Sequence, residues 1–275
     1  MRLMKLVSNI GEVDLNSRTN FFNRPQGFGF SFANQYFRSG NSQSVIESII
    51  ELPSFAGDIV FWRRPTQHAD FEAFVDYIAN SEWLQLHYQP ADTQYFVPIT
   101  IELMSKGEIE ENGMLTCPIL IRALKPWQLT TTLPSIEIKQ IAGGGKTYTY
   151  SYPFTYASSD SVHCYYFVRG HFSAGVSAII VGACVDPVLK GTVNGIEVFN
   201  MTIHLELEAG DVLQYMNVDG EENVTLNGTS VVDELNLSKR IFDKLPNGKN
   251  VKISLSATTG TPAAVITVYE FYRAV

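Results

Sequence analysis

One glycine-rich segment has residues that could bind phosphate. Gly143-Gly144-Gly145 is followed by Lys146 and Thr147, the pair that closes a phosphate-binding loop. That motif needs a further glycine five residues before Gly145, where Gln140 stands, and a following helix whose N-terminus meets the phosphates. The alternating residues from Tyr148 onward predict a strand instead. We therefore interpret the three glycines as part of a linker.

Histidine and cysteine residues in the second half are potential zinc ligands. They are His163, Cys164, His171 and Cys184. Zinc sites usually take their ligands in close pairs on one turn. Only His163 and Cys164 are close, and as neighbours on an expected strand they point to opposite faces of a sheet. We expect no metal site and no other cofactor.

Carboxylates gather at two places without forming a hydrolase pattern. Glu108, Glu110 and Glu111 flank the Asn112-Gly113 turn, and a second acidic group lies around the turn at 209–211. A hydrolase needs a converging carboxylate pair, or a nucleophile held by His and Asp, and no G-x-S-x-G motif is present. Solvated turns explain both groups. We therefore expect that the protein is not an enzyme.

Composition favours a β-rich protein and excludes several classes of partner. Of 275 residues, 17% are charged and 12% are aromatic, which fits either a surface covered by partners or large aromatic cores. The net charge of −8, without a basic stripe, argues against specific nucleic-acid binding. The three cysteines form no CxxC motif, and we expect no disulfides, no signal peptide and no membrane span.

Residues 1–130 predict an α+β domain, an antiparallel sheet with one covering helix. Phe71, Phe74, Val75 and Ile78 share one helical face, and Thr66 is a candidate N-cap. Strands are expected on both sides of this helix, at 28–32, 44–52, 57–62, 84–88, 97–103 and 114–124.

Residues 131–146 carry turn and linker chemistry, and residues 147–275 predict an all-β sandwich. The expected strands of this second domain are at 148–156, 164–168, 176–185, 195–199, 202–207, 212–218, 251–256 and 265–272. The last of them has apolar residues on both faces around Val268–Arg273, which fits a core strand or a partner surface.

The ordered set of residues resembles the distal tail protein family of siphophages, over nearly the whole chain. The residues that carry the resemblance are Gly57-Asp58-Ile59-Val60-Phe61, Leu84-Gln85-Leu86-His87-Tyr88, Gly113-to-Ile119, Trp127, Tyr152-to-Tyr156, Leu245-to-Gly248 and Tyr269-to-Arg273. The resemblance implies that residues 1–130 form a ring, with six copies around the tail axis, and that residues 147–275 form a galectin-like sandwich.

The same resemblance implies a structural hub in the virion tail tip, made in the bacterial cytoplasm. The ring would join the tail tube to the tail-associated lysin or fibre, and would dock receptor-binding proteins in some relatives. A closed ring repeats one heterologous interface, which an edge strand can supply. The candidate interface residues are Phe28, Phe30 and Phe32 on one expected strand, and Val97, Pro98 and Ile99 on another that Pro98 marks as an edge strand or a bulged strand.

Two other functions remain open at this point. The sandwich could be a binding module for a host glycan or a receptor-binding protein, and a β-sandwich hydrolase is a third hypothesis. Against glycan recognition, the sequence has no room for an inserted carbohydrate-binding module, and Trp62, Trp83 and Trp127 all precede position 130.

Overall fold

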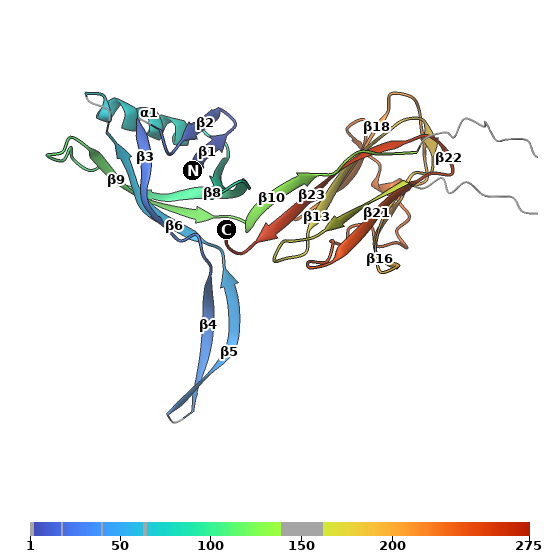
Figure 1. The fold of residues 1–275 in the computed structure, drawn as a ribbon, viewed down its shortest axis with the longest axis horizontal. Coiled ribbons are helices and arrows are strands. Elements are labelled where there is room, and N and C mark those ends of the chain that lie inside the picture. The colour runs from blue at the N-terminus through green and yellow to red at the C-terminus, as the bar shows by residue number, and fades with distance from the viewer. Residues whose placement is uncertain (1–2, 18, 40, 63–64, 139–161) are drawn as a thin grey trace, which may run out of the picture. The chain divides into compact units, whose positions relative to one another are not determined.

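The computed structural model describes residues 3–17, 19–39, 41–62, 65–138 and 162–275. It divides into two compact units: Met1–Leu129 with Tyr272–Val275, and Thr130–Phe271. The described residues form β-strands, one α-helix and one 3-10 helix (Figure 1). The helices in this part of the chain fall short of the length and apolar character that crossing a membrane requires.

The N-terminal unit is built on a curled antiparallel sheet. Its strands, in spatial order, are β2 (Gly11–Asp14), β1 (Leu3–Ser8), β7 (Leu84–Gln89), β8 (Tyr95–Met104), β9 (Leu115–Ala123), β6 (Ser54–Phe61) and β3 (Asn20–Gln26). The amide of Leu15 donates to the carbonyl of Met4 at 2.8 Å, and its carbonyl accepts from the amide of Phe22 at 2.8 Å. Leu15 thereby connects β1 to β3, so the sheet nearly closes on itself.

The helix α1 (Gln67–Ala79) lies where the amphipathic pattern predicts it. Phe74 is buried and its ring meets that of Phe61 at 5.9 Å, whereas Val75 is 37% exposed, so the buried stripe is narrower than expected. Thr66 precedes the helix, but its hydroxyl bonds the Asp70 carboxylate at 2.9 Å and caps no backbone amide. Thr66 is therefore the N-cap residue, as predicted, but without a capping hydrogen bond from its side chain.

Four aromatic rings fill the core of the N-terminal unit away from the helix. Phe28 lies 4.7 Å from Tyr88 and 5.1 Å from Phe55, centroid to centroid, and Phe55 lies 5.3 Å from Trp127. Phe55 and Trp127 are fully buried. Trp127 begins β10 (Trp127–Thr132), which pairs with β8 at Gln128 and Phe96.

The C-terminal unit contains two larger sheets and a small one. The first has the order β11 (Ile136–Glu137), β23 (Ala263–Tyr272), β13 (Gly175–Val181), β18 (Val212–Val218), β19 (Glu221–Leu226) and β20 (Thr229–Ser230). The second has the order β12 (Val162–Phe167), β21 (Asn250–Ser256), β15 (Val188–Val193) and β16 (Ile196–Thr202). The small sheet is β17 (Glu206–Leu207), β14 (Cys184–Val185) and β22 (Thr259–Gly260), and the 3-10 helix η1 spans Val232–Glu234.

The two larger sheets of the C-terminal unit share one apolar core, which makes this unit a sandwich. Ile180 and Ile266 come from the first sheet, and Leu189 and Ile253 from the second. The strand β23 lies inside the first sheet, between β11 and β13, so the core interpretation of the Val268–Arg273 segment holds for its buried part. Buried Glu270 accepts hydrogen bonds from the amides of Arg169 and Gly170.

Over its described part, the segment 131–146 that carries linker chemistry contains the short strand β11 and packs against the C-terminal unit. Ile136 pairs with Ala264 on β23, and Leu133 and Ile138 are buried in the C-terminal core. Alternating apolar residues hold this segment against the sheet, which outweighs its turn-forming composition. The glycines at 143–145 and the expected strand at 148–156 lie outside the described residues.

Candidate assembly surface

A separate two-stranded sheet extends from the N-terminal unit, and we call it the arm. It consists of β4 (Ser31–Ser39) and β5 (Ser42–Glu51), which project away from the curled sheet (Figure 1). Every described residue of these strands except Asn34 and Ile50 is exposed. An isolated two-stranded hairpin has marginal stability in water, because it covers too little apolar surface.

Most of the large apolar side chains of the arm lie on one face, which also carries the polar pairs Asn34 with Ser48 and Arg38 with Gln43. Directly paired residues of an antiparallel ladder lie on the same face, and the apolar pairs here are Phe32 with Ile50 and Tyr36 with Val45. Ile46 is the extra residue where the register shifts, beside Tyr36. Phe32 is 48%, Tyr36 54% and Ile46 67% exposed, although side chains of this type are normally buried.

The opposite face of the arm is more polar. It carries the pairs Ser31 with Glu51, Ala33 with Ile49, Gln35 with Glu47 and Phe37 with Ser44, so its apolar side chains are fewer and lie among polar ones. The hydroxyl of Ser31 donates to the Glu51 carboxylate at 2.9 Å. The arm is therefore amphipathic, with one face suited to water and one suited to burial against a partner.

A shallow apolar groove lies elsewhere on the N-terminal unit, at the end of α1 beside β7 and β8. Its volume is about 390 Å³. Trp83 and Leu124 line it and are 46% and 53% exposed. Pro98 and Ile101 contribute to its wall. Large apolar side chains that stay open to solvent around a concavity are typical of protein interaction sites.

The expected strand at 28–32 was wrong in its first part. Residues 27–30 form no strand, and the ring of Phe28 packs on the core, next to Phe55 and Tyr88. Gly27, at φ +92°, turns the chain inward, so the alternation does not continue through it. Phe30 and Phe32 are exposed, with rings in edge-to-face contact at 5.4 Å, at the start of the arm.

The prediction that Pro98 marks an edge strand was also wrong. β8 is paired with β7 on one side and with β9 and β10 on the other, and the side chains of Val97 and Ile99 are buried. The Pro98 carbonyl accepts from the Leu124 amide at 2.8 Å. Since the N and O atoms of one strand residue point the same way, the missing N–H faces the break between β9 and β10. The proline therefore costs no ladder hydrogen bond there.

The potential metal ligands and nucleophiles form no reactive site in the described part of the chain. Among the described residues, no group of three or more His, Cys, Asp or Glu side chains is placed to bind a metal ion. Burial raises the pKa of the Cys184 thiol to about 11 and raises the pKa of Cys117 and Cys164 above their usual range. These thiols are protonated at neutral pH, so they are poor nucleophiles.

The comparisons with known proteins follow the same division of the chain. Residues 5–124 match the family described as "Distal tail protein, N-terminal domain". The chain therefore carries a distal tail protein N-terminal domain. A comparison with curated protein sequences gives no match.

Solved structures of phage proteins share the distal tail protein fold over the whole chain. A protein of the phage P2 baseplate in its activated conformation with Ca matches with a TM-score of 0.64 and 14% identity, covering 100% of both chains. The same baseplate with Sr gives a TM-score of 0.63, also at 14% identity and with 100% of both chains covered. The Dit protein of phage SPP1, described as a paradigm of hub adsorption apparatus in phages that infect Gram-positive bacteria, matches with a TM-score of 0.60 and 9% identity, covering 97% of this chain and 98% of that one.

Sequence reasoning missed the groove. Trp83 lies in a turn that the hydrophobic pattern assigned to no element, and Leu124, expected at the end of the strand at 114–124, lies in the bend after β9. An available signal at Trp83 was that a large apolar side chain stands in a turn, where polar residues are expected. What the sequence could not supply is that these two turns lie beside each other.

Proposed function

We propose that this protein is a phage distal tail protein, a structural hub that assembles with copies of itself into a ring. The observation that carries the proposal is the arm, whose apolar face has no partner among the described residues of its own unit. Its strands of nine and ten residues reach about 30 Å. That length is enough to lie across a neighbouring subunit.

The apolar groove supplies a place for the arm of the next copy. The arm and the groove are different surfaces of the same unit, so arm-to-groove contact is heterologous. Repeated from copy to copy, such a contact produces a ring when the rotation closes. Pro98 and Ile99 line the groove. They therefore remain candidate interface residues, together with Phe30 and Phe32, although not through an exposed strand edge.

The ring would connect the phage tail tube to a tail-associated lysin or fibre and would dock receptor-binding proteins. The distal tail protein N-terminal domain and the fold shared with baseplate proteins support this role. A stoichiometry of six and a galectin-like C-terminal sandwich follow from the resemblance in the sequence and are part of the proposal. The role is non-enzymatic, consistent with thiols whose raised pKa keeps them protonated.

Native mass spectrometry and negative-stain imaging of the purified full-length protein test the proposal. We expect a species whose mass is a multiple of 30.7 kDa and particles with an axial hole. Dilution should convert this species to monomers through a concentration-dependent equilibrium. A monomer at every concentration, in images without rings, would contradict the proposal.

A further inference from the structure

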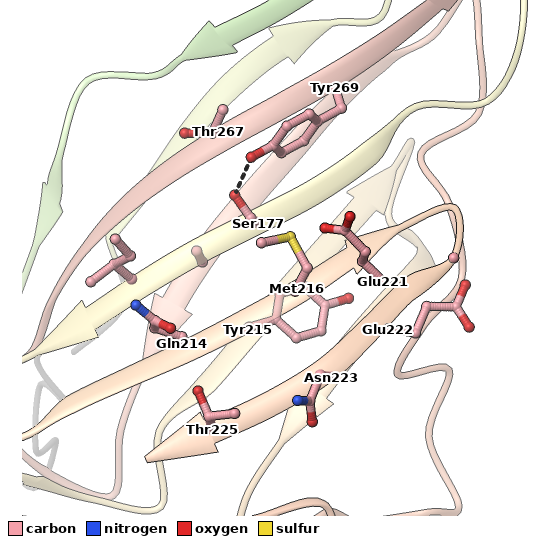
Figure 2. A pocket seen from close by; sticks show the side chains of 13 residues that line it. Ser177, Gln214, Tyr215, Met216, Glu221, Glu222, Asn223, Thr225, Thr267 and Tyr269 are labelled. Atoms are coloured by element: carbon pink, nitrogen blue, oxygen red, sulfur yellow. Dashed lines mark hydrogen bonds between the residues drawn. The ribbon is translucent and has the colours of Figure 1, made fainter. Parts of the chain in front are cut away.

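A broad hollow lies on the outer face of the first sheet of the C-terminal unit. It has a volume of about 680 Å³ and spans β23, β13, β18 and β19 (Figure 2). The sandwich core lies on the other face of these strands, where Ala178 and Tyr215 are buried. The hollow therefore lies in a solvent-facing sheet surface and is separate from the arm and the groove. We propose that this hollow binds a neutral saccharide.

The floor of the hollow consists of side chains brought together by register. Thr267 pairs with Ser177, Ser177 with Met216, and Met216 with Asn223, which places one row across four strands. In the next row, Gln214 pairs with Thr225. Figure 2 shows the Gln214, Asn223 and Thr225 side chains around this floor. The hollow is thus lined with amides and hydroxyls held by a rigid scaffold.

Part of this hydrogen-bonding capacity is unused within the described residues. The side chains of Gln214 and Thr225 bond no described group, and Asn223 uses only its oxygen, toward the Val224 amide at 2.8 Å and the Ser230 hydroxyl at 3.5 Å. Amide groups offer both donors and acceptors, which suits the hydroxyls of a sugar. The hollow can therefore replace the water around several sugar hydroxyls without leaving them unpaired.

Apolar surface for the carbon face of a sugar is also present. Tyr269 lies beside the hollow, and its hydroxyl is 3.3 Å from that of Ser177, which fixes the ring (Figure 2). Met216 lies in the middle of the floor. The lack of tryptophan after position 130 argues against a sugar site, but Tyr269 and Met216 provide the same kind of contact on a smaller scale.

Charge narrows the class of ligand. Glu221 and Glu222 line one end of the hollow, and no lysine or arginine lines it. Lys244, which does not line the hollow, pairs with Glu222 at 3.1 Å, so Glu221 is the carboxylate that would repel an anionic polymer, whereas carboxylates accept hydrogen bonds from neutral sugar hydroxyls. An extended peptide is disfavoured because β13 and β18 are each paired on both sides, so their backbone groups are already bonded.

Calorimetry with the full-length protein tests the inference. The probes are a panel of neutral oligosaccharides of glucose, galactose, N-acetylglucosamine and rhamnose, with poly(glycerol phosphate) as the anionic probe. We expect saturable binding of at least one neutral oligosaccharide and none of the anionic polymer. Gln214→Ala and Asn223→Ala should each weaken that binding by about tenfold, the effect of one lost hydrogen bond. Tyr269→Phe should weaken it less than Tyr269→Ala, because the ring remains.

A matched control uses the outer face of the other sheet. Tyr165 on β12 is 62% exposed, so Tyr165→Ala removes an aromatic ring without touching the hollow. The Tyr165→Ala variant should bind the neutral oligosaccharide with the same affinity as the unmodified protein. Three results would each overturn the inference: no neutral oligosaccharide binds, the anionic polymer binds in preference, or Tyr165→Ala loses binding that Gln214→Ala retains. Because no step uses the ring, these results are independent of the assembly experiment.

Discussion

The two units of this chain differ in how they bury apolar surface. The N-terminal unit extends an arm whose apolar face stays in water, with Tyr36, Val45 and Ile46 all more than half exposed. The C-terminal unit closes two sheets over one core, and the hollow on its outer face is lined by polar side chains together with Ile179, Met216 and Tyr269. A unit that leaves a marginal hairpin uncovered is structurally complete only with a partner, whereas a closed sandwich needs none.

The largest predicted effect is loss of assembly in an arm variant, and an arm variant that still assembles would break this comparison. Combining Phe32→Ser, Tyr36→Ser and Ile46→Ser should weaken association by about 100-fold or more, since each lost apolar contact costs about 1 kcal/mol or more. Native mass spectrometry over a dilution series measures the change. Because these side chains are exposed, circular dichroism should still report two folded units.

The C-terminal unit offers a matched control for the arm variant. Ile196 and Leu237 are 71% and 75% exposed, more than any apolar residue of the arm. Ile196→Ser with Leu237→Ser should leave the assembly intact, because these residues are scattered singly on a complete sandwich. If this control variant dissociates as much as the arm variant does, non-specific association through exposed apolar residues would explain the assembly, and the comparison would fail.

A second prediction separates the two cores. Phe55→Ala in the N-terminal unit and Phe199→Ala in the C-terminal unit each remove a fully buried ring. Each should lower the free energy of unfolding of its own unit by about 3–5 kcal/mol. Differential scanning calorimetry should show each variant lowering a different transition. A single transition that both variants shift equally would mean that the units unfold together.

A smaller effect is expected at the base of the arm. Gly27 has φ +92°, and a Cβ there would lie 1.9 Å from the carbonyl oxygen of Ser54. Gly27→Ala should therefore destabilise the N-terminal unit by about 1–3 kcal/mol, measured by chemical denaturation. Gly29 is the matched control, since a Cβ there meets nothing within 4 Å. Equal effects of the two substitutions would rule out strain at Gly27 as the cause.

Much of the fold could be predicted from local periodicity, and the failures have physical causes. The helix at Gln67–Ala79 follows a strong stripe of apolar side chains, so its pattern was sufficient. The prediction of a strand starting at Phe28 failed because the alternation of residues does not reveal that Gly27 turns the chain into the core. The prediction of an edge strand at Pro98 failed because the missing N–H of Pro98 faces a break between neighbouring strands, which only the register shows.

The candidate site was predictable only in part. Phe30 and Phe32 were recognised by their aromatic character, although a two-stranded arm cannot be told from a sheet strand by sequence pattern. The groove around Trp83 and the hollow around Gln214 depend on residues that meet through non-local strand pairing. Such meetings depend on register, which one sequence does not specify.

The smallest predicted effect is on the pH dependence of stability. It sharpens the comparison because the N-terminal unit should lose stability at acid pH and the C-terminal unit at alkaline pH. Burial lowers the pKa of His87, so its neutral form is favoured in the folded N-terminal unit. The unfolded chain takes up the proton more readily, so this unit loses stability as pH falls below about 6.5. His87→Gln should reduce this acid loss, measured as the midpoint of the lower-pH unfolding curve.

The C-terminal unit should lose stability at alkaline pH instead. Burial raises the pKa of Cys184 to about 11 and raises that of Tyr215, whose hydroxyl donates to the Ile241 carbonyl at 2.6 Å. Both groups deprotonate first in the unfolded chain, so stability falls as pH rises from about 9 toward 11. Cys184→Ala should reduce the loss of stability of the C-terminal unit at alkaline pH. An unchanged plot of stability against pH would rule out this thiol as a cause.

Hydrogen exchange of the arm tests the central claim most directly. The amides of Ser31–Ser39 and Ser42–Glu51 should exchange slowly in the concentrated, assembled protein, because a neighbouring copy covers the hairpin. They should exchange rapidly in the Phe32→Ser, Tyr36→Ser, Ile46→Ser variant, while the amides of β13 and β18 keep the same rate in both. Equally fast exchange of the arm in both proteins, or equally slow exchange in the monomeric variant, would contradict the account.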